Sequence, residues 1–214
     1  MQRYKAILWD FGGVLTTSPF DAFDRYEREH GLPPGFIRGI NARNHDTNAW
    51  ALFESNRCTM EDFDRLFEAE ARAAGHPLRG RIVIDLLGGD LRPRMVEVLK
   101  RCKQDWQCTC LTNNMNTGKE VGTWGTTQRA AAVAEVMTIF DRVIESSKEG
   151  LRKPDPRIYA LACERMGVAP AEVVYLDDLG INLKPAKAMG MTTIKVTSEA
   201  QAIEDLSSAL GIAL

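Results

Sequence analysis

The sequence predicts an α/β fold, namely a doubly wound parallel sheet with helices on both faces and a helical cap inserted after the first strand. Two observations carry this prediction. From Gly89 onward, strand-like and helix-like segments alternate along the chain. Before Gly89, residues 17–88 carry mostly helical apolar patterning and separate the first strand from the rest. We therefore expect a core of residues 1–16 and 89–214 and a cap of residues 17–88.

The strands are predicted by short apolar runs. Residues 6–9 lack alternation and stop at Asp10, shortly before Gly12 and Gly13, which is typical of a strand buried on both faces. Cys108 and Cys110 alternate along the second strand, so we expect them to share a face. The predicted strands cover residues 6–9, 106–112, 142–146, 173–176 and 192–196.

The core helices are predicted by apolar residues at 3–4 spacing and by signals at their ends. Asp155 and Pro156 are an N-cap and a first-turn proline, and Ser198 with Gln201 forms a capping box. The predicted helices cover residues 93–102, 128–140, 156–167, 183–189 and 198–211. The glycines at 118, 122 and 125 lack a phosphate-loop pattern and predict a loop near the site.

The inserted segment has helical signals of its own. Phe20 and Phe23 are spaced to share one helix face. Thr59 and Asp62 form a capping box before an apolar stripe that includes Phe63. Residues 17–88 therefore predict a small, mostly helical cap.

Composition excludes several classes of protein. Apolar residues make up 44% of the 214 residues and the formal net charge is −2, which favours a folded core over disorder. No basic excess exists to attract nucleic acid or an anionic membrane, and no apolar run approaches about 18 residues. Five cysteines without CxxC spacing and an N-terminus without a signal-peptide pattern indicate a reduced, cytoplasmic protein. We expect a monomer or a homodimer that binds neither nucleic acid nor membrane.

Polar clusters follow the predicted strands and carry the functional prediction. They comprise Asp10 with Gly12, residues 112–114, Lys153, and Asp177 and Asp178 with Asn182. Ligands of a doubly wound sheet bind outside the carboxyl ends of its strands, so we expect these clusters to meet in one cleft.

The residue types in these clusters indicate phosphoryl chemistry with a metal. Asp10, Asp177 and Asp178 cannot all stay ionised in a dry cleft without a cation, and oxygen ligands favour Mg²⁺. Thr112 and Lys153 supply a hydroxyl donor and a fixed positive charge, which suit a phosphoryl group in transfer. Asp10 is the candidate nucleophile.

With these motifs in order, the sequence resembles the haloacid dehalogenase superfamily of hydrolases, which have a Rossmann-like core. The matching segments are residues 8–15, 111–113, 150–159 and 173–191. The last segment is similar to the N-terminal phosphatase domains of soluble epoxide hydrolases. The resemblance implies a hydrolase acting on small-molecule phosphate monoesters.

The resemblance also implies a role for each site residue. Asp10 would be nucleophile and metal ligand, the Gly12 carbonyl and Asp178 would bind Mg²⁺, and Asp177 and Asn182 would support the site.

The same resemblance implies a phosphate-binding set. Thr112 and the backbone amide of Asn113 would hold the phosphate, and Lys153 would orient both phosphate and nucleophile.

Gly12 departs from the family pattern. Phosphatases of this family usually carry a second aspartate at this position as the general acid and base, a role typically worth about 10²–10⁴-fold in rate. Two alternatives to a phosphatase therefore remain open. One is a metal-independent 2-haloacid dehalogenase that uses Asp10, and the other is a catalytically weakened protein that binds a phospholigand.

Overall fold

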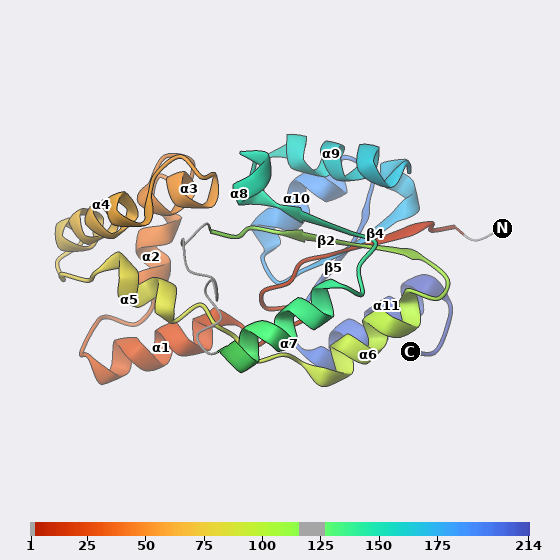
Figure 1. The fold of residues 1–214 in the computed structure, drawn as a ribbon, viewed down its shortest axis with the longest axis horizontal. Helices are drawn as coiled ribbons and strands as arrows, with labels where there is room; N and C mark the ends of the chain where they lie inside the picture. The colour runs from red at the N-terminus through yellow and green to blue at the C-terminus, as the bar shows by residue number, and fades with distance from the viewer. Residues whose placement is uncertain (1–2, 116–126) are drawn as a thin grey trace.

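A five-stranded parallel sheet forms the centre of the protein in the computed structural model, which describes residues 3–115 and 127–214 (Figure 1). The strands lie in the order β3-β2-β1-β4-β5, with β1 paired in parallel to both β2 and β4. Their bounds are β1 Ala6–Trp9, β2 Gln107–Thr112, β3 Arg142–Glu145, β4 Val173–Asp177 and β5 Thr192–Lys195. All five predicted strands are confirmed, with ends that differ by a residue at most. The predicted glycine loop at 118–125 lies outside the described residues.

Helices cover both faces of this sheet, as the unbroken apolar runs of β1 and β4 require. Cys108 and Cys110 share one face with Trp9 and pack against α6, α7 and α11, whereas Leu8 and Leu111 pack on the other face against α9 and α10. Figure 1 shows the two helical layers on opposite sides of the strands. The helices of this sheet region are α6 Pro93–Cys102, α7 Thr127–Met137, α8 Ser146–Glu149, α9 Pro156–Met166, α10 Gly180–Ala188 and α11 Glu199–Leu210, with a 3₁₀ turn η1 at Pro170–Glu172.

The capping signals act as predicted, and two helix boundaries differ. Asp155 accepts a hydrogen bond from the Arg157 amide, and Ser198 caps α11 with Gln201 in a capping box. The last predicted turn of α7 is absent because the chain tightens at Thr138, whose amide and hydroxyl both donate to the carbonyl of Glu135. Helix α10 begins three residues earlier than predicted, with Leu179 as the one residue between it and the Asp177–Asp178 pair.

Five helices occupy most of residues 17–88 and bury an aromatic core of their own. We call them the helical region; they are α1 Pro19–Glu29, α2 Phe36–Ala42, α3 Ala49–Glu54, α4 Met60–Ala73 and α5 Gly80–Asp85. The ring of Phe63 lies 4.7 Å from that of Phe53 and 5.5 Å from that of Phe67. Thr59 caps α4 by accepting from the Asp62 amide, as predicted. Phe20 and Phe23 lie 6.1 Å apart, which confirms that they share a face.

The chain enters and leaves the helical region at one place. Thr16 and Leu91 form an antiparallel bridge, and the Thr17 amide donates to the Asp90 carbonyl at 2.8 Å. A Cβ on Gly89 would lie 2.4 Å from the Thr17 carbonyl oxygen, so only glycine fits at this crossing. The two connecting segments are thus held side by side.

Two predictions about the whole chain can be compared with the fold. All five cysteines are unpaired, in agreement with the expectation of reduced thiols. Within residues 3–115 and 127–214, no helix combines the length and the apolar character that crossing a bilayer requires.

Candidate active site

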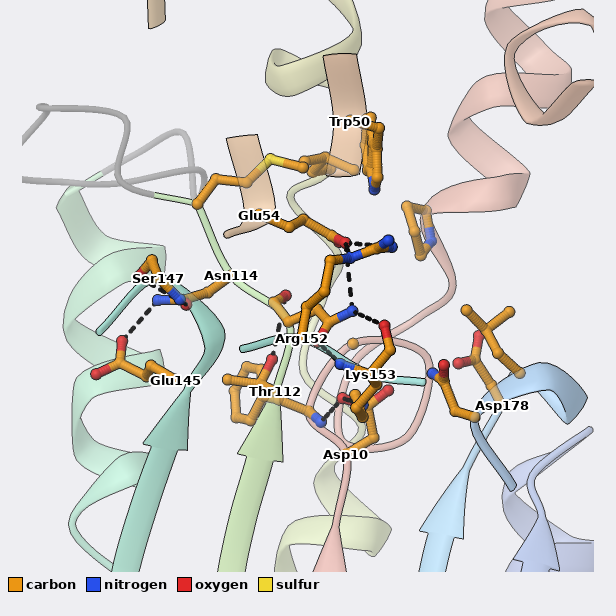
Figure 2. A pocket seen from close by; sticks show the side chains of 18 of the residues that line it. Asp10, Trp50, Glu54, Thr112, Asn114, Glu145, Ser147, Arg152, Lys153 and Asp178 are labelled. Atoms are coloured by element: carbon orange, nitrogen blue, oxygen red, sulfur yellow. Dashed lines mark hydrogen bonds and ion pairs between the residues drawn. The ribbon is translucent and has the colours of Figure 1, made fainter. Parts of the chain in front are cut away.

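The polar residues that follow β1, β2 and β4 meet at the carboxyl end of the sheet, as the sequence predicts (Figure 2). Asp10 follows β1 directly, Thr112 ends β2, Asp177 ends β4, and Lys153 comes from the loop between α8 and α9. A cavity of about 1130 Å³ opens above them, between the sheet and the helical region. The site is therefore assembled from segments far apart in the sequence.

Lys153 is the buried cation of this site. Its side chain is 1% exposed, and Nζ lies 2.8 Å from Oδ1 of Asp10 and 2.8 Å from Oδ2 of Asp177. Burial opposes the charge on the ammonium group, but the two carboxylates outweigh this effect and raise the pKa of Lys153 well above its usual range. Lys153 is thus held as a fixed positive charge beside Asp10.

Asp10 presents one bound and one unbound carboxylate oxygen. Oδ1 accepts from the Phe11 amide at 2.7 Å and from Lys153. In the described part of the chain, no hydrogen bond or ion pair reaches Oδ2. Burial raises the pKa of Asp10, Lys153 opposes that rise, and the charges of Asp177 and Asp178 add to it. Asp10 therefore has the geometry of an oriented nucleophile whose charge calls for a further cation.

Asp177 is fully engaged by protein donors. Its Oδ1 accepts from the Leu179 amide at 2.7 Å, and Asn182 Nδ2 lies 3.1 Å from each of its oxygens. Oδ2 also accepts from Lys153 and from the hydroxyl of Tyr175. With its lone pairs occupied, Asp177 orients Lys153, and Asn182 holds Asp177 in turn.

Asp178 is half-buried and packs against the loop after β1. A Cβ on Gly13 would lie 2.2 Å from Oδ2 of Asp178, and Gly13 has φ +75°, so glycine is required there on two grounds. Burial, with a contribution from Asp177, raises the pKa of Asp178 to about 6. A carboxylate held in this way binds a cation more readily than it stays ionised alone.

The donor set fits a hard divalent cation. Oxygens of Asp10, Asp177 and Asp178 lie within 4.8 Å of one another. Because Asp177 is already engaged, Asp10 and Asp178 are the members of this carboxylate group left to hold a metal. Gly12 lines the same cavity, and no atom of residues 3–115 or 127–214 lies within 4 Å of the place where its Cβ would be. Oxygen ligands with space for waters suit Mg²⁺.

Asn113 connects the end of β2 to the lysine loop through its side chain, which the sequence did not predict. Its Oδ1 accepts from the Lys153 amide at 2.9 Å, and its Nδ2 donates to the Lys153 carbonyl at 3.0 Å. Thr112 is buried and lines the cavity beside it. The backbone of the predicted phosphate-binding segment is thereby tied to the backbone of Lys153.

The helical region contributes residues to the site that sequence patterns did not single out. Glu54 accepts from Arg152 and from Asn113, across the boundary between the helical region and the sheet region. Trp50 and Phe20 line the cavity, whereas Phe53 packs inside the aromatic core. Arg152 lies in the matching segment 150–159, but nothing in the sequence reveals its contact with Glu54.

Two curated proteins resemble the chain over nearly all of its length. Mouse acyl-CoA dehydrogenase family member 10 is 31% identical over 222 residues, which cover 100% of this chain and 20% of that protein. Bifunctional epoxide hydrolase 2 from Sus scrofa is 28% identical over 98% of this chain and 39% of that protein. The chain thus spans well under half the length of these relatives.

A solved structure shares the fold. An enzyme of the HAD family from Bacteroides thetaiotaomicron, in complex with magnesium and inorganic phosphate, superposes with a TM-score of 0.59 at 18% identity. The match covers 92% of this chain and 96% of that one. The family model of haloacid dehalogenase-like hydrolases matches residues 4–190. The chain therefore belongs to the haloacid dehalogenase-like hydrolases.

Proposed function

We propose that this hydrolase is a Mg²⁺-dependent phosphatase of small-molecule phosphate monoesters that works through an aspartyl-phosphate on Asp10. The observation that carries the proposal is the state of the Asp10 carboxylate. Lys153 and the Phe11 amide hold Oδ1, while Oδ2, at the base of the cavity, has no donor among the residues that the structure describes. A carboxylate that is oriented at one oxygen and unbound at the other is suited to in-line attack.

The reaction follows from the residues around Asp10. Oδ2 attacks phosphorus, the P–O bond to the alcohol breaks, and the leaving alkoxide takes up a proton from solvent water. Water then attacks the phosphorus of the aspartyl-phosphate, which regenerates Asp10 and releases inorganic phosphate. Lys153 stays charged throughout and offsets the negative charge that gathers on Asp10 and on the phosphoryl oxygens.

The remaining site residues bind and orient the phosphate. The Thr112 hydroxyl and the Asn113 amide would donate to phosphoryl oxygens, because both lie beside the cavity at the end of β2. Magnesium, when held by Asp10, Asp178 and the Gly12 carbonyl, would supply positive charge that neutralises the phosphate next to two carboxylates. Asp177 and Asn182 would act only by keeping Lys153 in place.

The helical region would act as a cap, with residues 17–88 forming one domain and residues 1–16 and 89–214 the core. Two features support this division: the separate aromatic core of α1–α5, and the single crossing at Thr16 and Leu91. Placed above Asp10, a cap would exclude bulk water and contact the alcohol portion of the substrate. The bound magnesium and phosphate of the Bacteroides relative are consistent with the same chemistry here.

The test is a phosphate-release assay over a panel of phosphate monoesters, with and without Mg²⁺. We expect Mg²⁺-dependent turnover that falls to background in Asp10→Asn, a variant that keeps the size of the side chain but loses the nucleophile. The matched control is Asp21→Asn on α1, because Asp21 is an exposed aspartate of the helical region. Full activity of Asp10→Asn, or turnover unaffected by a chelator, would contradict the proposal.

The glycine at position 12, where the family's phosphatases carry an acid, favours two further candidate functions. A dehalogenase would release halide from a 2-haloacid in the presence of a chelator. A weakened phosphatase would gain activity when the acid is restored. Among the residues that the structure describes there is room for this change, because none of their atoms lies within 4 Å of a Cβ at Gly12. We expect Gly12→Asp to raise turnover of esters with poor leaving groups by about 10²-fold.

A further inference from the structure

Glu54 is a buried acid that joins the helical region to the segments around Lys153. It is the last residue of α3, and its side chain is 8% exposed. The carboxylate of a residue at this end of a helix faces unpaired backbone carbonyls, so burial there needs compensation. Figure 2 shows Glu54 reaching from α3 toward Arg152, above the Lys153 loop.

Arg152 supplies that compensation from the sheet region. Its Nε and Nη2 both lie 2.7 Å from Oε2 of Glu54, and its Nη1 donates to the His45 carbonyl at 2.8 Å. The guanidinium group thereby holds two points of the helical region at once. Since Arg152 immediately precedes Lys153 in the chain, its contacts with the helical region hold the backbone next to the buried lysine.

Asn113 carries the same contact to the other side of the lysine. Its Nδ2 donates to Oε2 of Glu54 at 3.2 Å as well as to the Lys153 carbonyl at 3.0 Å. Its Oδ1 accepts from the Lys153 amide. One carboxylate oxygen of Glu54 therefore fixes both Arg152 and Asn113, the two residues that bracket the backbone of Lys153.

A third contact comes from the Glu54 backbone. The Ser146 hydroxyl donates to the Glu54 carbonyl at 2.8 Å, and Ser146 Oγ accepts from the Asn114 amide at 3.0 Å. The residue after Asn113 is thus anchored to the end of α3 too. The contacts of Glu54 converge on the phosphate-binding segment and the lysine loop.

We propose that Glu54 is a positioning residue of the active site: it sets Asn113 and Lys153 in register with Asp10 when α3 is docked on the sheet region. This inference rests on the function proposed above, because it assigns a catalytic consequence to the position of Lys153. A buried ion pair on its own is a weak source of stability, so the value of this pair lies in the geometry it imposes. A displacement of about 1 Å at a reacting group costs about 100-fold in rate.

The test compares Glu54→Gln with Asp64→Asn. Both changes remove one buried negative charge from the helical region with little change in size. Asp64 pairs with Arg79 within that region and has no contact with the site. We expect Glu54→Gln to lower kcat by about 10- to 100-fold with KM changed less than about 3-fold. Asp64→Asn should keep the wild-type kcat.

A second variant keeps the test valid should Glu54→Gln fold poorly. Arg152→Lys preserves the charge but not the fork that reaches both Glu54 and the His45 carbonyl, so we expect a smaller fall in kcat in the same direction. The Glu54→Gln, Arg152→Lys double variant should lower the logarithm of kcat by less than the sum of the two single effects, because both residues act through one contact. Fully additive losses would overturn the shared role.

A readout independent of activity separates this proposal from the proposed function. In NMR spectra, Glu54→Gln should shift the side-chain amide of Asn113 and the backbone amide of Lys153, and Asp64→Asn should leave both in place. Unshifted resonances, or an unchanged kcat in folded Glu54→Gln, would overturn the positioning role. Shifted resonances in a protein that hydrolyses no phosphate ester would instead reject the proposed function alone.

Discussion

The carboxyl end of the sheet, called the sheet edge below, and the helical region both bury carboxylates. The surroundings of these carboxylates shift their pKa values in opposite directions. At the sheet edge, Asp10, Asp177 and Asp178 lie together with Lys153 as the nearby buried cation, and the pKa values of Asp10 and Asp178 are raised. In the helical region, Asp64 accepts from Arg79 and from the Arg81 amide, and its pKa is lowered. Charge left short of partners is available for chemistry, whereas charge that is fully paired serves the fold.

The largest expected effect tests whether the carboxyl end of the sheet depends on Lys153. Lys153→Met leaves Asp10 and Asp177 buried without their counter-charge. We expect activity to fall by at least about 10³-fold and the free energy of unfolding to fall by about 3–5 kcal/mol. Enzyme assays and denaturant unfolding measure the two effects.

A control for this change is Lys100→Met. Lys100 is an exposed residue of α6 paired with Glu97 at 2.8 Å. Loss of a solvated pair should change stability very little and leave activity intact. Equal losses in the two variants would mean that burial of Lys153 gives it no special role.

The next effect tests whether the two regions can be damaged separately. Phe63 is fully buried and contacts Trp50, Phe53 and Phe67. Phe63→Ala should cost about 3–5 kcal/mol through lost contacts and the cavity left behind, and Phe63→Leu should cost less. Thermal unfolding gives the loss of stability, and calorimetry with Mg²⁺ reports on the sheet edge. Loss of Mg²⁺ binding in folded Phe63→Ala would show that the regions do not behave independently.

The smallest effect compares the two kinds of carboxylate by pH. Asp178 has a pKa of about 6 against an ordinary 3.8, so the metal-free folded protein holds its proton more tightly than the unfolded chain. The raised pKa of Asp178 adds about 3 kcal/mol at most to the free energy of unfolding. This contribution is fully present below about pH 4 and is lost as the pH rises through 6. The lowered pKa of Asp64 makes stability depend on pH in the opposite direction. The stability from Asp64 is lost as the pH falls below 3.8, the ordinary pKa of an aspartate.

Denaturant unfolding across pH measures both slopes. Asp178→Asn should flatten the metal-free curve between pH 4 and 6, and Asp64→Asn should flatten it below pH 4. Added Mg²⁺ should reduce the first slope only, because it competes with protons at Asp178. A curve for Asp178→Asn that is as steep as the wild type would contradict the assigned pKa.

The sequence predicted the parts of the molecule that are governed by local rules. Strands 6–9 and 173–176 are read from unbroken apolar runs, and Asp155 and Ser198 mark helix starts by their capping chemistry. The clustering of Asp10, Lys153 and Asp177 also follows from the sequence, because parallel strands end at one edge of a sheet. These predictions need only the spacing of apolar and capping residues along the chain and the parallel direction of the strands.

The rest depended on contacts between distant segments. Glu54 and Arg152 are 98 positions apart, and no sequence pattern links the two. The roles expected for Asp177 and Asp178 likewise came from the family resemblance and not from residue patterns, since the two neighbours differ only in which donors surround them. The early start of α10 at Gly180 also escaped the periodicity, because Gly180 and Asn182 carry no apolar signal.

The bridge between Thr16 and Leu91 has a consequence for how such a protein can evolve. The two ends of the helical region are pinned together, so an insertion of another length would meet the same pair of anchor points. The entropy of closing a loop grows only slowly with its length, by about 0.6 kcal/mol for each doubling. Lineages can therefore exchange or remodel the whole insertion without disturbing the pairing of β1. The sheet region and the helical region can therefore change independently of each other, because they are joined at one crossing.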